Sequence, residues 1–326
     1  MSVASAARPF AERARRFDVA RARSLGILVP FVALFITLSI ASNAFATKVN
    51  LLNILDQQSA TLIIAAAGTL VLVAGGIDLS VGAVYALAGV TAAEVGQHHS
   101  AGLAITLGIG AAMLVGLANG LVTTLFRINS LIATLAMSFV ISGIASRITK
   151  GNLVVLFDKQ AFGELARTQF LTVKTSIWLM IGAVIVLAIV LARTTAGRYM
   201  YAAGGNAEAA RLSGVRVDAI RVLTFVLSGT AAGIAGVIDT SRVLSASASS
   251  ENTTLAFTVL AGIVVGGTSI LGGEGAVWRS VVGVLFIALI GNGYILLGLD
   301  PLYEQITMGA ILLLAVGLDA FTRRRT

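Results

Sequence analysis

Ten apolar segments follow one another along the chain, most of them close to the length that crosses a bilayer. A helix needs roughly 20 mostly apolar residues to span ~30 Å of hydrocarbon. Only 12% of the 326 residues are charged, so little of the chain is left for a soluble part. The pattern predicts an all-α polytopic membrane protein with about ten transmembrane helices and excludes an ordinary cytosolic enzyme. The segments are Ser24–Phe45, Gln58–Ala74, Val81–Val95, Ala101–Phe126, Ser130–Ile148, Thr175–Ala192, Arg221–Thr240, Leu255–Leu271, Val277–Leu297 and Leu302–Ala320.

The first apolar segment follows a basic tail, residues 1–24, which contains six arginines. A cleaved signal peptide is the alternative, because Ala44-Phe45-Ala46 fits the small-x-small cleavage pattern. The apolar run is longer than the roughly 7–15 residues of a secretory signal, so we predict an anchor. The predicted division is a cytoplasmic N-tail (1–24), one transmembrane domain (25–320) and a basic cytoplasmic C-tail (321–326).

The distribution of charge predicts an orientation. Lys and Arg concentrate in cytoplasmic loops. With the N-terminus inside and ten spans, 16 of the 23 Lys and Arg residues lie on the inner side and 7 on the outer side. We therefore expect both termini in the cytoplasm. The net charge of +8 then reflects topology, and nucleic-acid binding loses its support.

Several kinds of chemistry have no residues to carry them. There is no cysteine, no lysine follows a glycine as a phosphate-binding loop requires, and no metal-ligand spacing occurs. Ion-coupled carriers usually bury ionisable groups within their spans, and here the candidates are few, namely Asp78, Asp239 and Glu94. We expect no catalytic residue, metal site or cofactor in this chain, and an energy source in another chain.

Two glycine-rich segments resemble each other, one from Gly75 to Val84 and one from Gly266 to Val277. Asp78 and Ser80 could simply cap the following helix. Alternatively, interrupted helices border a translocation path, because non-helical backbone at membrane depth is tolerated beside a cavity. The candidate path-lining residues are Asp78, Ser80 and Asn292.

Glycines within the apolar segments fit packing faces between membrane helices, as in Gly229-x-x-x-Gly233, Gly233-x-x-Gly236 and Gly108-x-Gly110. Two connections are long. The outer one, 149–174, mixes phenylalanines with charges and is expected to lie as an interfacial helix.

The inner connection, 193–220, predicts a short capped helix. Asn206 is a suitable N-cap for Ala207–Leu212, and Gly214 can end the helix. Glu208 and Arg211 are three residues apart and can pair, while Leu212 and Ala209 form an apolar face. Two interpretations are open: this segment is an ordinary connector, or it is a protruding helix on which another protein docks.

This inner connection closely resembles the coupling loop of the ribose-type family of sugar ABC transporter permeases. The matching residues run from Gly197-Arg198-Tyr199 through Gly204-Gly205-Asn206 to Ala210-Arg211-Leu212-Ser213-Gly214. Three more matches follow the order of the family, namely Gly76-Ile77-Asp78-Leu79-Ser80-Val81-Gly82, Gly266-Gly267-Thr268-Ser269 with Gly272-Gly273 and Gly275, and Asn292-Gly293 near Leu296-Leu297-Gly298.

The resemblance implies a ten-span permease with a fold like that of type II ABC importers, working as a pair in the bacterial inner membrane. It implies a periplasmic sugar-binding protein outside and, inside, an ATPase with two nucleotide-binding halves that binds ATP and Mg²⁺. The ATPase-coupling residues it implies are Gly205, Asn206, Glu208, Ala209, Ala210, Arg211, Ser213 and Gly214. The expected function is the permease subunit of a monosaccharide importer for a ribose-like pentose or a hexose.

Three other functions remain open at this point. The first is a permease of the same type for a nucleoside or a sugar-like autoinducer. The second is a carrier driven by an ion gradient, and the third is a structural membrane scaffold. Neither the sugar nor the choice between a homodimer and a heterodimer can be read from the sequence.

Overall fold

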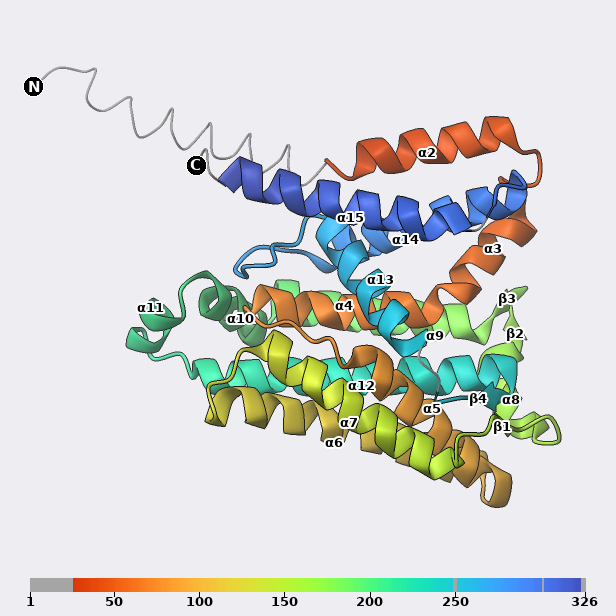
Figure 1. The fold of residues 1–326 in the computed structure, drawn as a ribbon, viewed down its shortest axis with the longest axis horizontal. Helices are drawn as coiled ribbons and strands as arrows, with labels where there is room; N and C mark the ends of the chain where they lie inside the picture. Colours follow the sequence, from red (N-terminus) through yellow and green to blue (C-terminus); the bar gives the residue numbers. More distant parts are fainter. Residues whose placement is uncertain (1–25, 249–250, 301, 324–326) are drawn as a thin grey trace, which may run out of the picture.

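The computed structural model describes residues 26–248, 251–300 and 302–323, and helices dominate it (Figure 1). Each of the ten apolar segments overlaps one helix. The helices are α2 (Leu28–Ala41), α3 (Lys48–Gln57), α4 (Ser59–Val73), α5 (Val81–His98), α6 (Ala101–Leu125), α7 (Ser130–Thr149), α8 (Gln160–Arg167), α9 (Thr175–Arg193), α10 (Thr195–Gly205), α11 (Ala207–Leu212), α12 (Val217–Val243), α13 (Glu251–Val265), α14 (Val277–Leu296) and α15 (Leu302–Arg323).

Among the described residues, five helices are long and apolar enough to cross a membrane: α6, α7, α9, α12 and α14. A sixth candidate is the pair α3 and α4, which is bent by 52° at its break. Shorter apolar helices lie at Leu28–Ala41 and Thr253–Val265. The chain is therefore an all-α multi-pass membrane protein. The segment predicted as Leu255–Leu271 begins earlier and ends earlier than expected, because its helix stops before Gly266 and Gly267.

Helix α4 forms the centre of the bundle. All fifteen of its residues are buried, and α9, α12, α13 and α14 surround it. Such burial on every side suits a helix without a single charged residue. Of the broken pair α3 and α4, the second helix is thus enclosed by other helices of the protein.

Helices α5, α6 and α12 pack closely through glycine, as the sequence predicted. A Cβ on Gly229 would lie 2.5 Å from the Ala112 carbonyl oxygen, and one on Gly236 would lie 2.1 Å from the Tyr85 carbonyl oxygen. Gly108 is equally tight, whereas a Cβ on Gly110 would meet nothing within 4 Å. The packing prediction is therefore confirmed at Gly108 and on α12, and it is wrong at Gly110.

The outer connection, 149–174, folds across one end of the bundle. Its strand β1 (Val154–Val155) pairs antiparallel with β4 (Ser245–Ala246), and β2 (Gln169–Phe170) pairs with β3 (Val173–Lys174). Helix α8 packs on α12, and Phe162 is fully buried there. The expected helix is present, but Phe162 packs against protein, because the Ser241 hydroxyl binds the backbone of α8.

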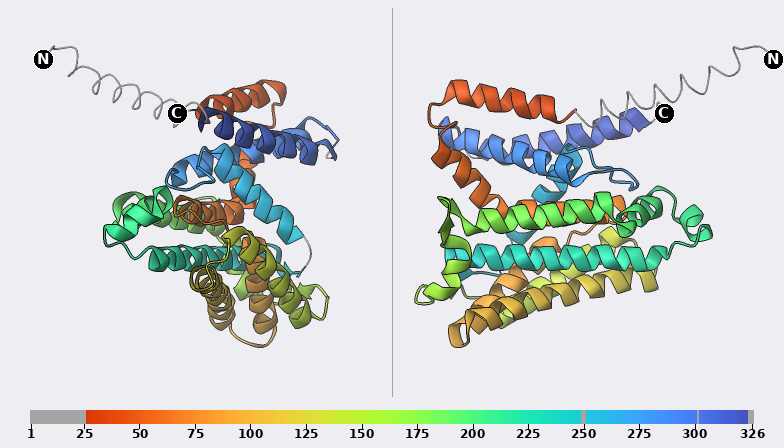
Figure 2. Two further views of the ribbon diagram at one scale, coloured as in Figure 1. Left: turned by 60° about the vertical axis from the view of Figure 1, so that its left-hand side comes forward. Right: turned by 180° about the vertical axis from the view of Figure 1, so that it is seen from behind.

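Helices α10 and α11 project from one end of the bundle, whereas α8, β1 and β4 lie at the opposite end (Figure 1). The view from behind shows the same separation (Figure 2). We call Thr195–Leu212, which comprises α10 and α11, the α10–α11 unit.

Candidate coupling and translocation site

Helix α11 forms as its sequence predicts. The Asn206 side chain caps it, because Asn206 Oδ1 accepts a hydrogen bond from the Ala209 N–H at 3.0 Å. At the other end Gly214 adopts a φ of 85°, and Val215 N–H donates to the Ala210 carbonyl at 3.0 Å. This is the Schellman arrangement, which satisfies carbonyl groups that a helix end leaves free. A six-residue helix is thereby fixed by its own caps.

The exposed surface of α11 includes two apolar residues beside its charged ones. Leu212 is 83% exposed, and Ala209 is exposed as well, whereas Ala210 is buried against the bundle. Leu212 therefore presents apolar surface that would be stabilised by burial against another protein.

Arg211 holds α11 in place through a residue that the sequence did not single out. Its guanidinium lies 2.9 Å from Asp218 Oδ1 in the first turn of α12, but 3.9 Å from Glu208 Oε2. The predicted Glu208 pair is therefore the weaker of two contacts. Glu208 is largely exposed, with 76% of its side-chain surface accessible.

Helix α10 was not predicted, because its residues were taken as part of a loop. Thr194 caps its N-terminus, because the Thr194 side chain accepts from the Gly197 N–H at 3.1 Å. The helix ends at Gly205, next to the cap of α11. The threonine cap was the one local signal for it. The two capped helices therefore follow each other without an intervening loop.

The two glycine-rich segments meet at the end of α10. A Cβ on Gly204 would lie 1.9 Å from the Val73 carbonyl oxygen and 2.6 Å from the Gly273 nitrogen. One on Gly272 would lie 2.8 Å from the Gly75 Cα. Three backbones therefore touch at distances that only glycine permits. We call this contact of Gly75, Gly204, Gly272 and Gly273 the glycine junction.

Hydrogen bonds hold the glycine junction together. Gly273 N–H donates to the Val73 carbonyl at 2.9 Å, which joins the loop 266–276 to the last residue of α4. The Tyr201 hydroxyl, from α10, donates to the Gly275 carbonyl at 2.7 Å. Burial raises the pKa of Tyr201, which keeps this phenol protonated as a donor. The α10–α11 unit is thus attached to both glycine-rich segments.

Beyond Gly75 the chain runs as non-helical backbone through residues 76–80 before α5 begins at Val81. Asp78 lies beside the middle of α12, because its Oδ2 accepts from the Ser228 hydroxyl at 2.8 Å and Ser228 is the twelfth of 27 residues in that helix. Of the two interpretations of this segment, the structure therefore favours an interrupted helix. The segment returns into the bundle as the non-helical first half of the element that α5 completes.

Asp78 and Ser80 do not cap α5 in the predicted way. Asp78 Oδ1 accepts from the Ser80 N–H and from the Ser80 hydroxyl, at 3.0 and 2.6 Å. The Ser80 side chain accepts no N–H of α5. It accepts instead from Asn119 Nδ2 on α6 at 2.7 Å.

Sequence reasoning missed the residues that stabilise this non-helical segment. The Ser130 and Thr134 hydroxyls of α7 accept from the N–H groups of Ile77 and Leu79, at 2.9 and 3.0 Å. An unpaired N–H in an apolar interior is costly, so these side chains permit the break. Their only signal was a hydroxyl at every fourth position of α7. Asn119 Oδ1 has no partner among the described residues.

Asn292 lies away from the other two candidates. Its side-chain amide forms two reciprocal hydrogen bonds with that of Asn50 on α3, each at 3.0 Å. The structure thus groups Asp78 with Ser80 but places Asn292 in a separate contact between α14 and α3. Within the described ranges, no three His, Asp or Glu side chains gather as metal ligands would.

Comparison with known proteins agrees with this architecture. Residues 50–316 match the profile of a family described as "Branched-chain amino acid transport system / permease component". The chain is 36% identical over 297 residues to the ribose import permease protein RbsC of Escherichia coli, covering 90% of this chain and 92% of that protein. The Bacillus subtilis RbsC is equally similar.

Other relatives are named as permeases for L-arabinose. The L-arabinose ABC transporter permease protein AraH of Azospirillum brasilense is 37% identical over 303 residues, covering 92% of this chain and 88% of that protein. These matches span nearly the full length of both partners. The chain is therefore a transport subunit rather than an enzyme, and it belongs to the family of transport-system permease components described by that profile.

Proposed function

We propose that this chain is the permease subunit of an ATP-driven, binding-protein-dependent importer of a monosaccharide, either a ribose-like pentose or a hexose. The relatives named for ribose and arabinose import support the substrate class. A periplasmic binding protein would deliver the sugar, and a cytoplasmic ATPase with two nucleotide-binding halves would supply the energy. The single structural observation that carries the proposal is the capped helix α11, exposed at one end and fixed to the glycine junction.

The topology that we propose has ten spans, a type II importer-like fold, both termini in the cytoplasm and a second permease copy or homologue in the inner membrane. The basic residues of the inner connection, 193–220, support this orientation, because Lys and Arg gather on the cytoplasmic side. The α10–α11 unit would then face the ATPase. The opposite end, with α8 and β4, would face the binding protein.

In this proposal the ATPase receives α11 in a surface pocket and moves it when ATP binds. The moving body would be the whole α10–α11 unit, since α11 follows α10 directly and both helices are capped. The ion pair of Arg211 with Asp218 joins this unit to the start of α12. Its motion would pass through the glycine junction to the ends of α4 and of the loop 266–276. The residues that we propose to border the path are Asp78, Ser80 and Asn292, each hydrogen-bonded to a different helix.

Transport by reconstituted vesicles tests this function. The vesicles would contain the permease with or without its ATPase, and the cognate binding protein would be loaded with radiolabelled D-ribose or L-arabinose. We expect uptake only with the ATPase and ATP on the same side of the membrane as α11. Uptake that persists without the ATPase, or that stops when an ion gradient is collapsed at constant ATP, contradicts the proposal.

Docking of α11 is tested separately by replacing Leu212 with serine. Burying a leucine contributes about 1.5–3 kcal/mol, so the affinity for the ATPase should fall about 10- to 100-fold. Leu171, which is 70% exposed in the β2–β3 turn at the opposite end, provides the matched control Leu171→Ser. Equal recovery of the ATPase with both variants would remove α11 from the interface.

A further inference from the structure

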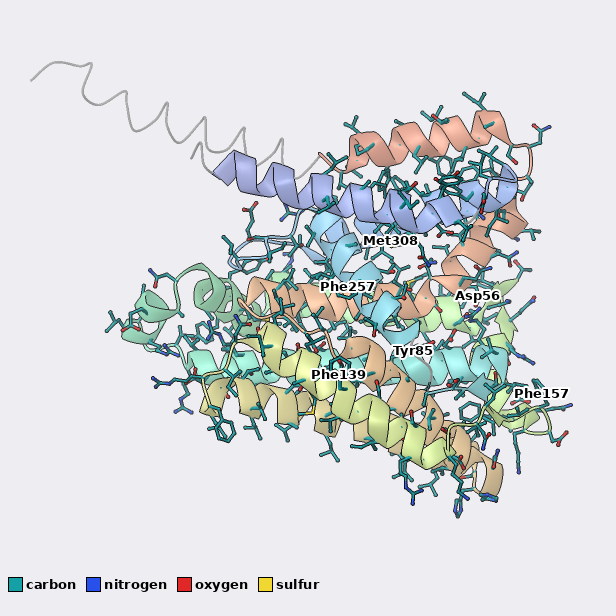
Figure 3. All side chains as sticks on the ribbon, in the orientation of Figure 1. Asp56, Tyr85, Phe139, Phe157, Phe257 and Met308 are labelled. Atoms are coloured by element: carbon teal, nitrogen blue, oxygen red, sulfur yellow. The ribbon has the colours of Figure 1, made fainter. Side chains whose placement is uncertain are left out.

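A cavity of about 360 Å³ opens at the end of the bundle opposite the α10–α11 unit. It lies between α5, the last turns of α12, strand β4 and the start of α13, and Figure 3 shows Tyr85 between α5 and α12. Its volume is within the range of small-molecule sites, roughly 300–1,000 Å³. The coupling site does not use it.

The polar part of the cavity wall contains one charged group, and that charge is balanced. Asp239 Oδ1 accepts from the Arg242 guanidinium, with Nε at 2.9 Å. Asp239 Oδ2 accepts from the Tyr85 hydroxyl. The pair of opposite charges is partly exposed, with accessible fractions of 21% and 25%. A balanced wall favours a neutral ligand over an ion.

Hydroxyl groups make up the rest of the polar wall, from Thr240, Ser245 and Ser247. Thr240 is 4% exposed, and no hydrogen bond joins its side chain to another described residue. Its Oγ1 is not one of the fully enclosed unpaired atoms, so it is open to the cavity. Gly89 leaves the room beside it, because a Cβ there would lie 2.5 Å from Thr240 Oγ1. The hydroxyl is therefore available to a ligand in the cavity.

The remaining wall is small and apolar, with Ala86, Gly89 and Leu255. A sugar ring combines hydroxyl groups with an apolar C–H face, and it needs both donors and acceptors from its site. Asp239 can only accept, and the Thr240 hydroxyl can donate or accept. The cavity thus offers each type of contact that a neutral sugar requires.

We propose that this cavity is a receiving site within the permease for a neutral monosaccharide, contacted by Tyr85, Asp239 and Thr240. The proposal rests on the sugar-importer function and adds to it a site in this chain. Delivery from the binding protein would place the sugar here before the path opens toward the α10–α11 unit.

Two conservative variants test the site. Tyr85→Phe removes one hydroxyl, and Thr240→Val removes a hydroxyl that makes no hydrogen bond in the fold. A purely structural role predicts that Thr240→Val leaves stability and transport unchanged. Tyr303→Phe is the matched control, because Tyr303 is 59% exposed on α15, far from the cavity in the sequence and fold.

Equilibrium dialysis of the purified permease–ATPase complex against millimolar radiolabelled D-ribose or L-arabinose measures binding without the binding protein. We expect each cavity variant to weaken binding about fivefold to tenfold, as the loss of one hydrogen bond does. Sugar transported per ATP hydrolysed should fall in both variants. The melting temperature of Thr240→Val, and every measurement on Tyr303→Phe, should stay at the parent values.

The outcomes separate the two proposals. Normal ATP-dependent uptake by the parent together with unchanged binding and uptake in Thr240→Val and Tyr85→Phe overturns the cavity and leaves the importer function standing. Uptake by the parent without any binding of either sugar at millimolar concentration does the same. A parent complex that transports neither sugar from its binding protein overturns the importer function and the cavity together.

Discussion

Replacing Gly204 with alanine tests how rigidly the α10–α11 unit is joined to the bundle. The new Cβ would lie 1.9 Å from the Val73 carbonyl oxygen and 2.6 Å from the Gly273 nitrogen. Both obstacles are backbone atoms, and they are hydrogen-bonded to each other, so neither can rotate away. One of the three backbones must move by about 1 Å, in an interior packed as densely as an organic crystal.

The cost of this substitution follows from two opposing effects. Overpacking a tight contact costs about 1–3 kcal/mol. Exchanging glycine for alanine in a helix gains back up to about 1 kcal/mol. We therefore expect Gly204→Ala to destabilise the junction by about 1–2 kcal/mol and to reduce ATP-dependent uptake, since the displaced unit no longer contacts both glycine-rich segments.

The assay compares apparent melting temperature and uptake in vesicles for the parent and Gly204→Ala. Gly205→Ala is the control for stability, because the adjacent Cβ would meet nothing within 4 Å. Its melting temperature should equal or exceed that of the parent. A Gly204→Ala protein that melts and transports like the parent would refute the argument that the close approach at Gly204 is required.

Three further substitutions have outcomes set by their contacts. Gly108→Ala should destabilise the protein by about 1–3 kcal/mol, because its Cβ would lie 2.7 Å from a backbone oxygen of α5, whereas Gly110→Ala should be neutral in the same thermal unfolding assay. Ser228→Ala should cost about 1–3 kcal/mol, because the half-buried Asp78 side chain loses a donor, and an unchanged melting temperature would contradict this. Asn50→Leu should destabilise the protein more than the double variant Asn50→Leu/Asn292→Leu, because the single change leaves the Asn292 amide without its partner. Unfolding measurements in a double-mutant cycle give the difference.

The sequence was sufficient wherever structure depends on near neighbours. Each apolar segment became a helix because its own residues satisfy its backbone and face an apolar environment. Helix α11 was predicted with both caps, since Asn206 and Gly214 act within a few residues of themselves. The glycine faces of α12 were predicted for the same reason, because small side chains at helical spacing allow close approach to any neighbour.

The course of residues 76–80 could not be predicted, because it depends on partners far along the chain. Its N–H groups bond to hydroxyls of Ser130 and Thr134, and its carboxylate bonds to Ser228. The row of hydroxyls on α7 was visible in the sequence, but it did not indicate a distant partner, because most hydroxyls in apolar helices bond to their own helix. The second contact of Arg211, with Asp218, was missed likewise because it crosses from α11 to α12.

The position of the break explains how a small motion at α11 can reach the far half of the bundle. The glycine junction touches the chain at Gly75, where α4 ends, and α4 is buried on all sides and cannot readily shift. The non-helical segment after Gly75 has no helical ladder of its own, and the N–H groups of Ile77 and Leu79 bond only to side-chain hydroxyls, which they can exchange at modest cost. Motion of the α10–α11 unit would therefore displace α5 more easily than α4. Tyr85 is the fifth residue of α5, so that displacement acts directly on the wall of the cavity at Asp239.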